Sequence, residues 1–149
     1  MGLIKNLFNK AIDNITPQWL IQLIDEDFMK AFAGATALIA CADGKIDNSE
    51  EEKIRNYIRN TKNLKGFDVE TVMKHFKEYA DAIMCDLQMG QEIIYKALDE
   101  IKDERDSAKL LIRACCAIGA ADGNFDADER KVVKDICNRL NLDPRNFNL

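Results

Sequence analysis

A short acidic motif occurs twice in the chain, and this repeat limits the possible folds more than any other feature of the sequence. Residues 43–50 and 122–129 both follow the pattern Asp-Gly-x-[Ile/Phe]-Asp-x-x-Glu, offset by 79 positions. Each copy comes directly after an apolar, alanine-rich run. Two similar stretches at a fixed offset indicate an internal duplication. We therefore expect a helix, an acidic turn and a second helix to occur twice, in repeat units of about residues 27–62 and 106–141.

Apolar side chains recur at helical spacing along most of the chain, and no window alternates for long enough to form a β-strand. Residues 27–42 and 107–121 are apolar nearly all round, which is typical of helices buried in the centre of a domain. Their small side chains should let these two helices pack closely together. We expect residues 1–149 to form a single all-α domain, a bundle of about seven helices built on the duplicated unit.

Several helix boundaries can be predicted from capping residues. Asp68 should cap a helix over residues 69–83, and Asp103 or Asp106 should cap the second central helix. Pro144 should begin a last helical turn. Residues 3–15 have an amphipathic pattern, so we expect them to pack on the core or to contact a partner or a membrane surface.

Composition argues against several classes of function. The formal net charge of −5 disfavours a nucleic-acid surface, which needs clustered lysine and arginine. The five cysteines lack CxxC spacing, and reduced thiols in a cytoplasmic protein are the simplest interpretation. No apolar run reaches the roughly 18 residues needed to span a membrane. No catalytic constellation accompanies the single histidine, His75, so we do not expect an enzyme.

Most positions of the acidic motif have a purely structural explanation. In each copy the second aspartate stands before a helix and the glutamate follows three positions later, as in a capping box. The apolar residue before this cap, Ile46 or Phe125, would act as a hydrophobic staple. The glycine, Gly44 or Gly123, would end the preceding helix. None of these roles requires a ligand.

The first aspartate of each copy, Asp43 or Asp122, differs because it stands at the C-terminal end of a helix. The helix macrodipole disfavours a carboxylate there and favours a cation. Solvent exposure with an Asx-turn, a nearby lysine or arginine, or a bound metal ion would each offset this cost. The spacing also matches the second half of an EF-hand loop, although the first two carboxylates of that loop are missing.

A metal site is the functional interpretation of the two turns. If the turns face one another, their carboxylates would repel unless cations lay among them. The candidate ligands are Asp43, Asp47, Glu50, Asp122, Asp126 and Glu129. Oxygen ligands favour Ca²⁺, Mg²⁺ or Mn²⁺. Zn²⁺ would need cysteine or histidine, and buried structural cysteines are the simpler interpretation of Cys41, Cys115 and Cys116.

The doubled motif, the ending over residues 142–149 and the amphipathic start together resemble the bacterial tellurite-resistance protein family TerB, over the whole chain. The resemblance implies an all-helical, non-enzymatic cytoplasmic protein of the Ter stress-response system. It also implies metal binding at the six acidic positions and action with membrane-linked Ter partners, including the membrane protein TerC, with peripheral contact at the inner face of the membrane.

Two hypotheses follow for the function of the chain. In the first, the protein is an adaptor that binds divalent cations through its acidic turns in a tellurite or metal stress pathway. In the second, it is a structural interaction module whose acidic turns are only helix caps.

Overall fold

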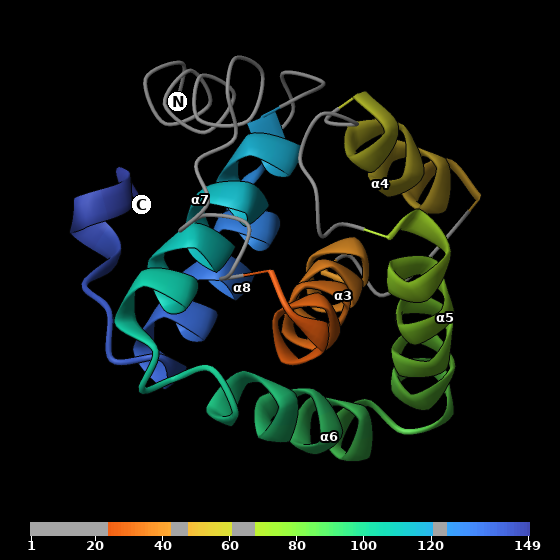
Figure 1. Ribbon diagram of the computed structural model, residues 1–149, viewed down its shortest axis with the longest axis horizontal. Helices are drawn as coiled ribbons and strands as arrows, with labels where there is room; N and C mark the ends of the chain where they lie inside the picture. Colours follow the sequence, from red (N-terminus) through yellow and green to blue (C-terminus); the bar gives the residue numbers. More distant parts are fainter. Residues whose placement is uncertain (1–23, 43–47, 61–67, 121–124) are drawn as a thin grey trace.

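The computed structural model describes residues 24–42, 48–60, 68–120 and 125–149, and these segments are mainly helical (Figure 1). The elements are α3 (Glu26–Ala40), α4 (Asn48–Asn60), α5 (Val69–Cys85), α6 (Leu87–Asp99), α7 (Arg105–Ala120), α8 (Ala127–Arg139) and the 3-10 helix η1 (Pro144–Phe147). None of the described segments contains a β-strand, and the predicted all-α class is confirmed. Within the described part, no helix is both long and apolar enough to cross a membrane.

Helix α3 lies in the middle of the bundle, with the other helices arranged around it (Figure 1). It packs against α5, α6, α7 and α8, and every residue from Ala31 to Ala40 is buried. A helix enclosed in this way has to be apolar on all sides. The predicted central position of this segment is therefore confirmed, and its first turn is capped by Asp25, whose Oδ1 accepts a hydrogen bond of 2.9 Å from the Phe28 amide.

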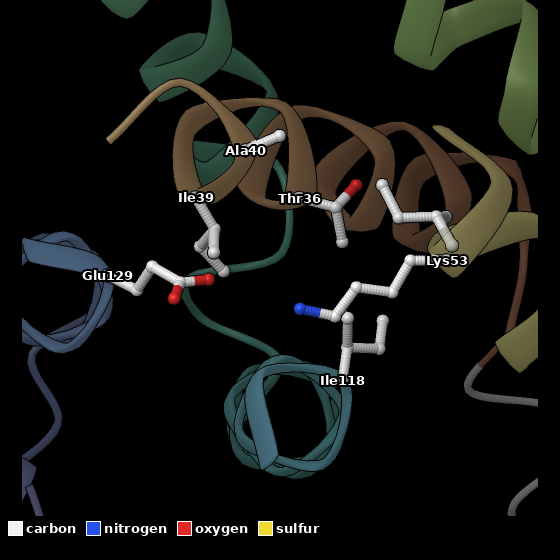
Figure 2. A pocket seen from close by; sticks show the side chains of 7 residues that line it. Thr36, Ile39, Ala40, Lys53, Ile118 and Glu129 are labelled. Carbon is white, nitrogen blue, oxygen red and sulfur yellow. The ribbon is translucent and has the colours of Figure 1, made fainter. Parts of the chain in front are cut away.

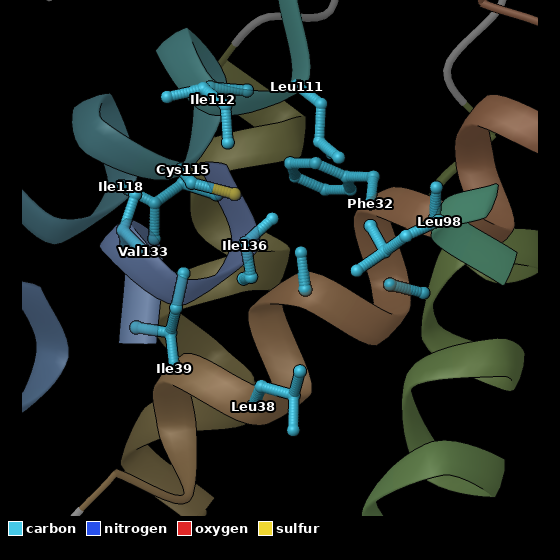
Figure 3. Close-up of a cluster of buried hydrophobic side chains, with 14 of the residues drawn as sticks. Phe32, Leu38, Ile39, Leu98, Leu111, Ile112, Cys115, Ile118, Val133 and Ile136 are labelled. Carbon is cyan, nitrogen blue, oxygen red and sulfur yellow. The ribbon is translucent and has the colours of Figure 1, made fainter. Parts of the chain in front are cut away.

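The core is built from side chains of α3, α6, α7 and α8 that meet between the helices (Figure 3). Phe32, Leu98, Leu111 and Ile136 are completely shielded from solvent. Burying an aliphatic or aromatic side chain of this size contributes about 1.5–3 kcal/mol. The bundle is therefore stabilised mainly by this apolar contact between the central helix and its neighbours.

Two glycines allow helices to approach closely, and both involve α6. A Cβ on Gly34 of α3 would lie 2.8 Å from Ile94 Cγ2, and one on Gly90 would lie 2.7 Å from the backbone of Ile83 on α5. The two small-residue helices α3 and α7 do pack against each other, as expected, but α3 makes more extensive contact with α5 and α6. Gly34 of α3 allows the close contact with α6. The repeat pattern in the sequence does not indicate that α6 is a neighbour of α3.

The helix starts follow the offset of the acidic motif. Helices α3 and α7 begin 79 residues apart, at Glu26 and Arg105, and α4 and α8 begin 79 residues apart, at Asn48 and Ala127. The four helices therefore begin in the same register relative to the two acidic turns. The duplication itself stays a prediction.

Two predicted helix starts are confirmed and one is wrong. Asp68 caps α5 through a 3.1 Å hydrogen bond from the Glu70 amide to Oδ1, and Pro144 begins η1. Neither Asp103 nor Asp106 caps α7.

The start of α7 is set by Glu104, the residue directly after Asp103. The carbonyl of Glu104 accepts the first helical hydrogen bond, 2.9 Å from the Ala108 amide. Asp106 consequently lies inside the first turn. There its negative charge interacts favourably with the positive end of the helix macrodipole, but Asp106 is not the N-cap.

Candidate functional site

A small pocket lies where four helices converge, α3, α4, α7 and α8 (Figure 2). Its cavity volume is about 10 Å³, which is close to the minimum for one water molecule. The lining residues are Thr36, Ile39, Ala40, Lys53, Ile54, Ile118 and Glu129. The walls are mostly apolar, and the charged groups come from α4 and α8.

The pocket lies beside the helix ends that precede the two acidic stretches in the sequence. Ile39 and Ile118, which are 79 positions apart, line it from the last turns of α3 and α7. Helix α3 ends at Ala40 and α7 at Ala120, directly before the two acidic stretches. The structure thus brings the exits of α3 and α7 to one region of the bundle.

Glu129 and Lys53 place opposite charges at this pocket. Both side chains extend into the space between α3 and α7, Glu129 from the first turn of α8 and Lys53 from α4 (Figure 2). Sequence reasoning did not identify Lys53 as part of the site. Its position three residues after Glu50, on the same face of a helix, is the signal that could have indicated it.

Asp126 and Glu129 form a capping box at the start of α8, as predicted. Asp126 Oδ1 accepts a 2.8 Å hydrogen bond from the Glu129 amide, and Glu129 Oε1 accepts one of 3.3 Å from the Asp126 amide. Asp126 has extended backbone geometry with φ of −77° and ψ of 175°, which is usual for an N-cap. These two carboxylates therefore already satisfy amides of the first helical turn.

The predicted hydrophobic staple at Phe125 has a different form. The position that should oppose Phe125, four residues into the helix, is occupied by Arg130, whose guanidinium carbon lies 5.6 Å from the ring centroid. A cation–π contact takes the place of the apolar pair. On its other side the ring lies so close to Gly119 that a Cβ there would be 2.7 Å from it. Phe125 therefore packs the turn against the last part of α7.

Only part of the six-residue candidate set can be located. Asp126 is exposed and Glu129 is half-buried at the start of α8, and Glu50 belongs to the first turn of α4. The remaining three, Asp43, Asp47 and Asp122, lie outside the described residues. Within the described segments no group of three His, Cys, Asp or Glu side chains is arranged to hold a metal ion. The six-carboxylate site stays a prediction.

The helix ends that lead into the acidic turns carry no positive side chain of their own. Neither α3 nor α7 has a basic residue in its last turn. The negative end of each macrodipole favours a cation at this point. A side chain of another helix, such as Lys53 of α4, or a bound ion would supply this charge, and exposure to solvent would make it unnecessary.

The three buried thiols and the imidazole are poorly suited to a metal at the turns. Burial raises the pKa of Cys116 to about 11 and that of Cys137 to about 12, and it also raises the pKa of Cys115. Thiols with such pKa values stay protonated at neutral pH, which disfavours them as metal ligands. His75 lies on α5, which contributes no residue to the pocket, and its Nδ1 is 3.6 Å from Glu78 Oε2.

Fold and site together define a class of small helical-bundle proteins in which two acidic turns follow two helices of one core. Residues 29–149 match the family model for tellurite resistance protein TerB. The chain belongs to the TerB family, and it is a protein related to tellurite resistance. A relative is the tellurium resistance protein TerB of Alcaligenes sp., which is 27% identical over 89 residues, covering 60% of this chain and 73% of the relative. No solved structure matches the chain.

Proposed function

We propose that this protein is a non-enzymatic component of a tellurite or metal stress-resistance system that binds divalent cations through its two acidic turns. The observation that supports this proposal is that the two helix ends preceding the acidic turns meet at one pocket. The last turns of α3 and α7 and the first turn of α8 all contribute to it, and neither α3 nor α7 has a basic residue at its end. Two negative helix ends followed by acidic stretches favour a cation between them.

The ligand chemistry favours hard cations. Carboxylate oxygens would come from Asp43, Asp47, Glu50, Asp122, Asp126 and Glu129. Ca²⁺, Mg²⁺ and Mn²⁺ prefer such oxygen ligands, whereas Zn²⁺ prefers sulfur and nitrogen. Because Asp126 and Glu129 also cap α8, cation binding would share these carboxylates with the helix start.

The proposed cellular role is that of a cytoplasmic adaptor for other Ter-system proteins, including the membrane protein TerC. Membership of the TerB family supports this role. Peripheral contact with the inner face of the membrane would follow from such a partnership.

Thermal unfolding of chelator-stripped protein tests the cation proposal. Ca²⁺, Mg²⁺, Mn²⁺ and Zn²⁺ are added separately to the wild type and to the Asp43→Asn/Asp122→Asn variant. A cation at about 100 times its Kd adds about 2.7 kcal/mol, which corresponds to roughly 5–10 °C for a chain of this size. We expect one of the hard cations to raise the Tm of the wild type but not that of the variant.

A matched control removes the same charge elsewhere. Asp81 and Asp103 are exposed aspartates on other parts of the bundle, so Asp81→Asn/Asp103→Asn should keep the full cation-dependent shift. A second variant, Lys53→Gln, should bind the cation more tightly because it removes a positive charge from the pocket. If no cation shifts the wild type, or if both aspartate variants respond equally, the turns are not a cation site.

The alternative function is a structural interaction module whose acidic turns serve only as helix caps. The capping box of Asp126 and Glu129 favours it, because both side chains already accept the reciprocal hydrogen bonds of a helix start. The two functions differ in what happens when the charge of a turn is removed but its capping geometry is kept.

A further inference from the structure

A second pocket, here called the α6 pocket, is formed by the end of α3, one side of α6 and one side of α8. Its cavity volume is about 150 Å³, and it shares no lining residue with the pocket between α3, α4, α7 and α8. A cavity of this size can hold a benzene ring. The bundle therefore offers a separate space for a small organic molecule.

Most of the lining of the α6 pocket is apolar. Leu38 belongs to α3, Cys41 and Ala42 follow directly after that helix, Leu87 begins α6, and Val132 comes from α8. Leu87 is 56% exposed although it lines the pocket. A ligand in the pocket would cover apolar surface that water now contacts, and removing such surface from water favours binding.

The α6 and α8 residues that line the pocket each lie on one side of their helix. Leu87, Gln91 and Tyr95 are spaced four residues apart, which places them in one row along α6. Val132 and Asp135 are three residues apart and are neighbours on one face of α8. The α6 pocket is therefore one continuous surface, made of a single row of α6, a single face of α8 and the end of α3.

Three polar side chains, Gln91, Tyr95 and Asp135, also line the α6 pocket. Burial, and next the charge of Asp135, raise the pKa of Tyr95, so its hydroxyl keeps its proton at neutral pH. In the part of the chain that the structure describes, neither Gln91 nor Asp135 forms a side-chain hydrogen bond or an ion pair. A few polar groups in a mostly apolar pocket are the usual means of orienting a bound ligand.

The guanidinium of Arg139 lies at the side of the α6 pocket, but its charge is already balanced. It stands 5.2 Å from the ring centroid of Tyr95 and forms two hydrogen bonds, of 2.9 and 2.7 Å, to the carboxylate of Asp99. A bidentate pair of this kind satisfies both partners. Asp135 has no such partner, and α3, which ends at the pocket, has no basic residue in its last turn. The pocket therefore favours a ligand group that donates hydrogen bonds over an anionic one.

We propose that the α6 pocket binds a small aromatic molecule that carries one amine or hydroxyl group. The ring would lie against Leu87 and Val132, and the N–H or O–H group would donate a hydrogen bond to the carboxylate of Asp135. A protein partner fits less well, because Leu87 alone among the exposed large apolar side chains of the described segments lines the pocket. A protein interface buries about 1,200–2,000 Å². The proposal goes beyond the cation site and does not depend on it.

Protection of Cys41 from alkylation tests the proposal on the full chain, with a chelator present. Cys41 is half-buried and lines the pocket, whereas Cys85 on α5 is exposed and does not line it, so each molecule carries its own control. The reaction of both thiols with iodoacetamide is followed by mass spectrometry while benzyl alcohol or benzylamine is titrated. We expect both probes to slow the reaction of Cys41 saturably, with a Kd below about 1 mM, and to leave Cys85 unaffected. Toluene, which lacks the donor, and benzoate, which carries an anion, should bind about tenfold more weakly or less.

Three variants locate the binding, and the Tm of each checks that the bundle is intact. Leu87→Gln should weaken binding of benzyl alcohol several-fold, whereas Met89→Gln, an equally exposed residue of α6 that does not line the pocket, should have no effect. Asp135→Asn should reduce the discrimination against benzoate, because it removes the negative charge. The proposal is overturned if neither probe protects Cys41, if Cys85 is protected equally, if toluene protects as well as benzyl alcohol, or if Leu87→Gln binds like the wild type. Discrimination against benzoate that is unchanged in Asp135→Asn would overturn it as well.

Discussion

At the scale of single residues, Asp126 carries a capping role that is visible in the structure and a ligand role that is proposed. Its Oδ1 accepts the Glu129 amide at 2.8 Å, and this bond satisfies one of the free amides of the first turn of α8. In the presence of a chelator, Asp126→Ala should lower the free energy of unfolding by about 1 kcal/mol in urea titrations. Asp126→Asn should cost little, since asparagine caps a helix as well as aspartate does.

The two substitutions also separate the two roles. Asp128→Ala is the matched control, because Asp128 is an exposed acidic residue of the same first turn but is not the N-cap. It should cost only a few tenths of a kcal/mol through the macrodipole. If Asp126 is also a ligand, Asp126→Asn loses part of the cation-dependent rise in Tm despite keeping its cap. An unaltered rise would leave Asp126 as a cap only.

At the scale of elements, α6 is the helix whose position depends most on close contact. Gly90 lies against the backbone of Ile83, which lets the start of α6 approach α5. Toward its other end, Arg139 of α8 forms two hydrogen bonds to Asp99, of 2.9 and 2.7 Å, and lies 5.2 Å from the ring centroid of Tyr95. These contacts fix the position of α6 against α5 and α8.

Two glycine substitutions compare a rigid neighbour with a movable one. Alanine is favoured over glycine in a helix by about 1 kcal/mol, but a Cβ at Gly90 would meet backbone atoms of Ile83 at 2.7 Å. Overpacking of this kind costs about 1–3 kcal/mol. We expect Gly90→Ala to lower the urea midpoint at constant m-value. Gly34→Ala meets the side chain of Ile94 instead and should cost less. An equal or smaller loss for Gly90→Ala would contradict the close α5–α6 contact.

Local signals predicted the elements well, because the forces involved act within one or two helical turns. The caps at Asp68 and Asp126 and the start at Pro144 depend on side chains within a few residues. The cap of α7 was predicted wrongly within the same short stretch, because Glu104 and the neighbouring Asp103 and Asp106 all lie within one turn of the helix start.

The neighbours of each helix could not be predicted in the same way, because they depend on contacts between distant segments. The contact of Gly34 with Ile94 joins residues 60 positions apart, and no periodicity specifies it. The spacing of Lys53 from Glu50 is a local signal, but the pocket that Lys53 lines exists only where α3, α4, α7 and α8 meet. The exposed residues Met89 and Ile93 fit an apolar helical pattern, yet the pattern does not say which apolar face is covered.

At the scale of the whole molecule, the buried thiols make stability depend on alkaline pH. Cys115, Cys116 and Cys137 are fully buried between α7 and α8, and burial holds the pKa of Cys116 at about 11, above its ordinary value of 9.0. Between these two values the unfolded chain loses a proton that the folded chain keeps. The free energy of unfolding therefore falls as pH rises through this interval, and it is unaffected by this thiol below about pH 8.

Urea unfolding of the wild type and Cys116→Ala at pH 8 and pH 10 measures this dependence. Each pH unit between the unfolded and folded pKa removes up to about 1.4 kcal/mol per thiol. The stability advantage of the wild type should therefore shrink by about 1 kcal/mol over this range, while lysine and tyrosine titrations affect both proteins alike. Curves that stay parallel would mean that the Cys116 thiol ionises as easily in the folded bundle as in the unfolded chain, and the contact of α7 with α8 would then admit water.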